Sequence, residues 1–264
     1  GAVTIKSVAA GTKGVSGALV FSSGTTTSGN SGSLSIGTGI STLGHGGAIT
    51  VTVGAGNKNV GGSVTVTAGL STAIGGGVVT VTSGAGNTVG GDMSVSGGAG
   101  TSNTGGAISI ISGTGAATTS GSVIIKTMDA GTKGISGALV FTSGTTNSGD
   151  SGVITIGSGT STGGFGGQID VLVGSGTKDG GGTLSIRSGT TTQTGTTGTG
   201  GAFMLTAGSG KGATGGSVSL VGGSGALTTS GSVTIKTMDA GTKGISGALV
   251  FTSGATTSGD SGVI

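Results

Sequence analysis

A motif of about fifteen residues recurs along the whole chain and constrains its fold more than any other feature. Residues 47–90 show it three times in succession, as GAITVTVGAGNKNVG, GSVTVTAGLSTAIGG and GVVTVTSGAGNTVG. Each repeat opens with Gly, carries apolar residues two and four positions later, and reaches another Gly at the seventh position in most cases. A unit this short cannot bury its own apolar residues, so the pattern predicts that repeats stack on one another.

The alternation of apolar and Ser or Thr residues predicts one β-strand per repeat with one buried face. The chain is therefore expected to be all-β, a parallel β-solenoid with about 15 residues per coil and roughly 18 stacked coils. Coils of 30 or 45 residues are the alternatives. The seventh-position glycines, such as Gly24 and Gly69, are expected at tight corners that need positive φ or close backbone approach.

The interior of such a solenoid would be a ladder of apolar side chains from the second and fourth positions. Its expected members include Val3, Ile5, Leu19, Phe21, Ile49, Val51, Val64, Val66, Leu139, Phe141, Leu249 and Phe251. A smaller apolar set is expected on the outer face, where it could pack against another chain: Val20, Ile124, Val140, Met204 and Val250.

The sequence also contains a longer repeat, which spans several of the fifteen-residue repeats. Residues 121–154 recur at 231–264 with three differences, and a weaker copy opens the chain, so the copies lie eight and then seven short repeats apart. That spacing favours one short repeat per coil. We expect one continuous array over 1–264, with long repeats at 1–120, 121–230 and, incomplete, 231–264, as a segment of a longer protein.

Composition excludes several classes of protein. Of 264 residues, 69 are Gly and none is Pro, and Gly does not recur at every third position, which excludes collagen. The 32% of hydrophobic residues are regularly placed, which argues against a disordered linker. Ten basic residues are scattered without a run or interleaved aromatics, so nucleic acid is not expected as a partner. The chain also lacks an apolar stretch of about 18 residues, so no membrane span is expected.

The residues that carry catalytic chemistry are scarce. The sequence holds no Glu or Cys, one His and seven Asp. An acid–base pair would have to come from Asp alone, and His45 lies at an expected corner without visible partners for a metal. We expect no enzyme activity, no cofactor and no metal.

Two polar sets and one loop remain as candidate interaction sites. Lys133 and Asp150 fall at nearly equivalent places in adjacent repeats, as do Lys243 and Asp260, so ion pairs between coils are predicted. A local array that would lie on one outer face resembles the ice-binding face of small solenoid antifreeze proteins: Thr50, Thr52, Thr65, Thr67, Thr80 and Thr82. The loop at 189–200 carries four extra residues and is expected to bulge.

Repeats of the form SGALVFTSGTTNSGDSGVITIGSGTSTGG resemble Gly/Ser/Thr-rich tandem-repeat extracellular proteins of diatoms and related algae, of β-solenoid type. This resemblance covers the whole chain. It implies an extracellular or cell-wall location and brings no catalytic residues.

These features together predict a non-enzymatic structural protein that forms a rigid extracellular fibre or filament from stacked β-coils. Self-association is the expected partnership, and surface polysaccharide is a second candidate partner. The alternative is a binding module, either an ice-binding solenoid or an adhesin stalk.

Overall fold

The computed structural model describes residues 1–58, 60–178, 180–193, 198–212, 214–242 and 244–264. The chain divides into two units, Gly1–Asp129 and Ala130–Ile264, which we call the N-terminal and C-terminal halves. Their boundary falls inside the long repeat at 121–230, and the division into long repeats stays a prediction.

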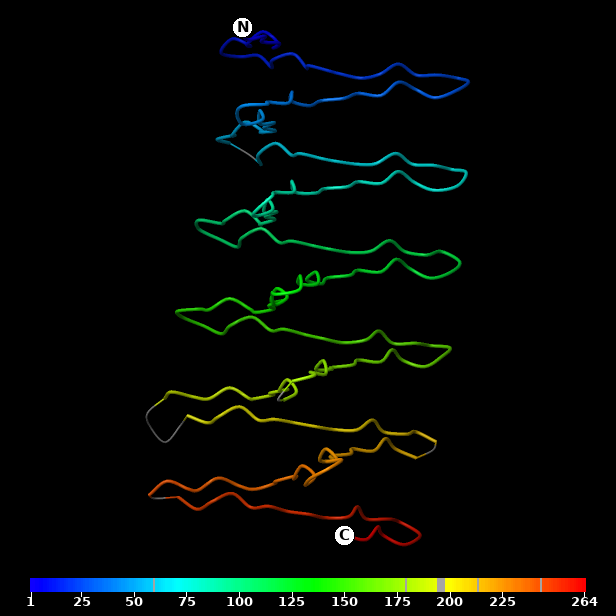
Figure 1. Cartoon of the computed structure of the whole chain (residues 1–264), viewed down its shortest axis with the longest axis vertical. Helices are drawn as coiled ribbons and strands as arrows, with labels where there is room; N and C mark the ends of the chain where they lie inside the picture. The colour runs from blue at the N-terminus through cyan, green and yellow to red at the C-terminus, as the bar shows by residue number, and fades with distance from the viewer. Residues whose placement is uncertain (59, 179, 194–197, 213, 243) are drawn as a thin grey trace. The chain divides into compact units, whose positions relative to one another are not determined.

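The chain forms neither helix nor β-strand in any of the described ranges, so the prediction of an all-β solenoid is wrong (Figure 1). Paired strands must run about 4.8 Å apart so that their backbones can exchange hydrogen bonds. The backbone hydrogen bonds here instead lie within one loop or join a loop to the Gly that follows it, and none joins two apolar segments within the described part of the chain. The alternating segments are therefore unpaired coil.

Each short repeat contributes one apolar segment, from its opening Gly to the sixth residue after it, and one loop. The chain bends at the tips of these loops about every fifteen residues. In the N-terminal half the tips are 12–13, 27–29, 42–44, 57–58, 72–74, 87–89, 101–103 and 116–118. In the C-terminal half they include 132–133, 147–149, 162–164, 177–178, 211–212, 226–228 and 257–259.

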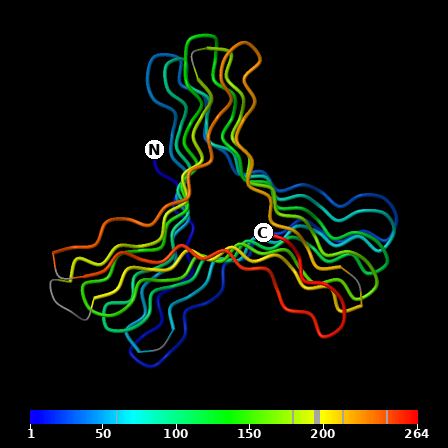
Figure 2. The ribbon, with the colours of Figure 1, turned by 90° about the horizontal axis from the view of Figure 1, so that it is seen from below.

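Consecutive loops point in different directions within each half. In the N-terminal half, Figure 2 shows the loops with tips at 12–13, 57–58 and 101–103 pointing the same way, with two differently directed loops between each pair. One circuit of the chain therefore takes three repeats, and the favoured prediction of one repeat per coil is wrong. Because successive apolar segments run in different directions, equivalent segments do not become direct neighbours.

A backbone hydrogen bond closes the base of many loops. The N–H of an opening Gly donates to the carbonyl of the seventh-position Gly of the repeat before it. These bonds are Gly77 to Gly69 (2.9 Å), Gly91 to Gly84 (2.9 Å), Gly106 to Gly98 (2.8 Å), Gly121 to Gly113 (2.9 Å), Gly201 to Gly189 (2.9 Å), Gly216 to Gly208 (2.8 Å) and Gly231 to Gly223 (2.8 Å).

A small residue at the sixth position accompanies every one of these closed bases. Ala68 precedes the Gly77 bond, and a Cβ added to Gly77 would lie 3.3 Å from the Ala68 Cβ and 3.2 Å from the Gly69 N. Where the sixth residue is Val53, its Cγ1 would lie 2.5 Å from a Cβ on Gly62. The base of that loop carries no such bond. The opening Gly is therefore a position where the chain passes close to the preceding repeat.

The seventh-position glycines do not behave as the sequence led us to expect. Among the described residues, positive φ occurs at Gly29, Gly149 and Gly259. Gly24 and Gly69 are not among them, and an added Cβ at either position would meet no heavy atom within 4 Å. What Gly69 supplies is its carbonyl oxygen, which any residue type offers.

No side chain in the described part of the chain is buried, so the expected interior ladder is absent. Large apolar side chains range in exposure from 42% at Val53 to 102% at Leu43. The chain exposes 25740 Å². A folded monomer of this mass exposes about 10,000 Å² and an unfolded one about 34,000 Å². Fixing a Gly-rich backbone carries a large entropy cost, which a few apolar residues per repeat do not offset within one chain.

Exchanging the sixth residues of two neighbouring loops tests this account of the loop base. Ala68→Val should open the base and weaken the Gly77 to Gly69 bond, whereas Val53→Ala should let Gly62 form the equivalent bond to Gly54. One exposed hydrogen bond contributes about 1 kcal/mol, which corresponds to roughly a fivefold change in amide protection. The rates of hydrogen exchange at the amides of Gly77 and Gly62 measure the strength of these two hydrogen bonds. Unchanged protection at both amides would show that the sixth residue does not control the base.

Candidate functional site

The molecule presents two kinds of surface, the apolar segments and the loop tips. Neither forms a pocket, and the described residues enclose no cavity.

The apolar segments keep the alternation seen in the sequence, although both of their faces are exposed. Leu139 is 50% exposed and Phe141 63%, whereas Val140 between them is 72% exposed. The copy at Leu249, Val250 and Phe251 follows the same order. In these segments, the residues expected in the ladder lie on the less exposed face. The residues expected on the outside lie on the more exposed face.

Every expected ladder residue is at least half exposed, with Leu139 the lowest in that set. The expected outer residues Val20, Ile124, Val140, Met204 and Val250 are also exposed. Each segment therefore offers apolar side chains in both directions. The regular spacing of the repeats places such an exposed apolar segment about every fifteen residues along the chain.

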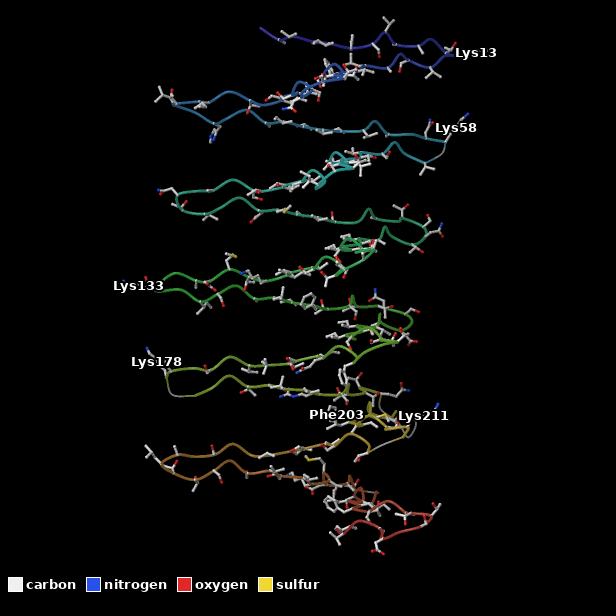
Figure 3. The ribbon with its side chains drawn as sticks, turned by 90° about the vertical axis from the view of Figure 1, so that its right-hand side faces the viewer. Lys13, Lys58, Lys133, Lys178, Phe203 and Lys211 are labelled. Carbon is white, nitrogen blue, oxygen red and sulfur yellow. The ribbon has the colours of Figure 1, made fainter. Side chains whose placement is uncertain are left out.

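Half of the ten basic residues lie at the described loop tips or beside them. Five lysines lie at tips or beside them and extend outward, as Figure 3 shows: Lys13, Lys58, Lys133, Lys178 and Lys211. Phe203, by contrast, lies on an apolar segment. Lys133 occupies a turn in which the Gly134 N–H donates to the Gly131 carbonyl at 3.3 Å. The turn leaves the ammonium group in solvent.

The predicted ion pairs remain predictions. Lys133 lies at a loop tip, while Asp150 follows Gly149 at the end of the next tip. Lys243 lies outside the described residues, and its predicted partner Asp260 follows Gly259 in the same way.

The six threonines of the predicted array are exposed, but they lie on three consecutive apolar segments. Thr50 and Thr52 belong to the first segment, and the other two pairs belong to the next two. These segments run in different directions in the N-terminal half (Figure 2). The single chain therefore does not place all six on one plane.

His45 lies just beyond the tip at 42–44, and no group of three metal-binding side chains occurs among the residues described. Across the same ranges, no helix has the length and apolar character needed to cross a membrane. The four extra residues of 189–200 lie between Gly189 and Gly201, whose hydrogen bond closes that base, although 194–197 are outside the described residues.

Two loop tips share an arrangement that was not predicted from the sequence. The Thr146 hydroxyl donates to the Ser148 carbonyl (3.0 Å) and accepts from the Ser148 N–H (3.3 Å), and Gly149 follows with a φ of 106°. Thr26, Ser28 and Gly29 repeat the arrangement. The signal in the sequence was the Ser-Gly dipeptide followed by Asn or Asp, a known turn former.

No protein-family model, no curated protein and no solved structure matches the chain. The resemblance to repetitive algal surface proteins therefore stays a prediction.

Replacing Gly149 tests the role of positive φ at this tip. Gly149→Ala should strain the backbone by about 1–2 kcal/mol, because a Cβ disfavours this region. The tip should rearrange, with altered NMR chemical shifts at Thr146 and Ser148. Gly144→Ala is the matched control, since its added Cβ meets no heavy atom within 4 Å and its φ is not positive. Equal shift changes in both variants would contradict the prediction.

Proposed function

We propose that the protein is a non-enzymatic structural protein whose chains associate through their apolar segments into an extracellular fibre. The observation that carries this proposal is a regularly patterned set of apolar side chains, none of which is buried among the described residues. Contiguous exposed apolar surface of this extent is typical of surfaces that bind other macromolecules. Removing it from water on association would supply the stabilisation that one chain lacks.

The repeat explains why the partner should be another copy of the same chain. Each repeat offers nearly the same segment, so a second chain can align with the first in a regular way. Contacts that recur along an array need not close into a ring, and open association of this kind produces filaments. Stability would then increase with the number of repeats that take part.

The polar residues support the same role. Ser, Thr and Gly separate the apolar residues, and charged residues make up 6% of the chain, so little repulsion opposes close packing. The absence of Glu and Cys from the sequence, with one His, supports a role without catalysis. The lack of Cys is compatible with an extracellular protein that does without disulfides, and the resemblance to repetitive surface proteins points to the same location. Surface polysaccharide remains a second partner to consider.

The association can be tested with two matched variants of the full chain, each carrying four substitutions in the N-terminal half. One replaces four segment residues (Ile49→Thr, Val51→Thr, Val64→Thr, Val66→Thr). The other replaces four loop residues that are at least 97% exposed (Ile40→Thr, Leu43→Thr, Val60→Thr, Ile74→Thr). Because each buried apolar side chain contributes roughly 1.5–3 kcal/mol, the segment variant should raise the concentration for half-association at least about tenfold.

Sedimentation velocity over a concentration series measures this effect, and electron microscopy shows whether the associated species are fibres. The loop variant should associate nearly as the unmodified chain does. If the unmodified chain stays monomeric at every concentration, or if both variants lose association equally, the apolar segments do not drive assembly.

A further inference from the structure

The positions of the lysines carry an inference beyond self-association. Lys13 lies at the tip 12–13 and Lys58 at the tip 57–58, which are 45 residues, or three short repeats, apart. Because one circuit of the chain takes three repeats, these two tips point in the same direction within the N-terminal half (Figures 2 and 3). Two ammonium groups are therefore presented on one side of that half.

The C-terminal half contains the same arrangement. Lys133 and Lys178 are also 45 residues apart, and their tips lie on one side of that half (Figure 3). Lys178 precedes Asp179 in the sequence, a residue outside the described ranges. The N-terminal pair has no acidic neighbour in its two loops, AGTKG and AGNKNVG, so it is the clearer case.

The other charged residues of the N-terminal half lie elsewhere. Lys6 and Lys126 belong to apolar segments, Asp92 follows the opening Gly91, and Asp129 follows the segment that begins at Gly121. The half thus has four lysines against two aspartates, with Lys13 and Lys58 at loop tips. Positive charge at the tips is separated along the chain from the carboxylates.

We propose that Lys13 and Lys58 form a surface that binds a linear acidic polysaccharide, a polymer of sugars bearing sulfate or carboxylate groups. Each ammonium group offers three hydrogen-bond donors to an anionic oxygen. Thr12 and Asn57 are the residues that precede them, and their hydroxyl and amide groups suit sugar hydroxyls. One polymer that reaches both tips gains avidity, because its second contact is intramolecular.

The same residues disfavour a nucleic acid as the polymer. Proteins that bind single-stranded nucleic acid stack the bases on aromatic side chains. The chain has no Trp or Tyr, and none of its five Phe residues lies in the two lysine loops. The inference rests on the proposed function in one respect, the extracellular location in which the chain would meet such a polymer. The lysine surface itself does not require chain association.

Binding of the full 264-residue chain to immobilised dextran sulfate tests the proposal, with uncharged dextran as the reference. The measurements are made below the concentration at which the chain associates. The test variant is K13Q/K58Q, and the matched control is K6Q/K126Q, which removes the same charge from apolar segments. All four lysines are exposed, so neither variant disturbs a packed interior.

The unmodified chain should bind dextran sulfate, bind dextran far less, and lose affinity as salt is added. K13Q/K58Q should weaken binding roughly 2- to 30-fold, as expected for two exposed ionic contacts, and K6Q/K126Q should weaken it less. Equal losses in the two variants would show that net charge alone matters. Absence of binding by the unmodified chain would also overturn the proposal.

A single-stranded oligonucleotide of matched charge serves as a further probe. Equally tight binding to it, with the same loss in K13Q/K58Q, would overturn the assignment to polysaccharide. Sedimentation of K13Q/K58Q separates this inference from the proposed assembly. Unchanged association together with lost polymer binding would support both, whereas a chain that never associates but binds dextran sulfate through the two tips would contradict the assembly alone.

Discussion

The loops depend on a close approach between two points of the backbone, which a hydrogen bond closes at the base of seven of the described loops. In seven loops the sixth residue is Ala, Ser or Gly and the next opening Gly donates a hydrogen bond across the base, as Gly77 does to Gly69. A small sixth residue does not by itself form the bond, since Gly32 and Gly152 follow Ser23 and Ser143 without it. Where the sixth residue is Val53, its branched side chain occupies that space. The loops are thus defined locally, within one repeat and the start of the next, and no buried interior is needed to form them.

Local definition of the loops leaves the apolar residues without a partner inside the chain. Leu139 and Phe141 alternate with Val140 as a strand would require, yet all three are at least half exposed. Hydrophobic burial is the main favourable contribution to folding, so a chain that exposes these side chains must find that contribution outside itself. This physical requirement links the structure to the proposed assembly. It also explains why loop tips, which do not need burial, are free to carry Lys13 and Lys58.

Much of the loop pattern could be predicted from the sequence, and the packing could not. The fifteen-residue spacing of the bends follows the repeat, because turn chemistry is set by nearby residues, but the bends at 27–29 and 72–74 lie beyond the expected corners at Gly24 and Gly69. The prediction of paired strands failed, because period-two alternation shows that a segment has two distinct faces and does not show what lies against them. Lys133 and Asp150 illustrate the same gap, since equivalent positions in neighbouring repeats do not establish contact in space.

The sequence by itself determined the fifteen-residue spacing, the alternation of apolar residues within each segment and the scarcity of catalytic side chains. It determined these because each follows from residue type and from interactions between residues close in the chain. Only the tertiary structure decided that three repeats make one circuit, and hence that Lys13 and Lys58 share a side. The direction of each loop depends on backbone angles summed over a whole repeat, and small differences at many glycines change that sum without altering the pattern of residues.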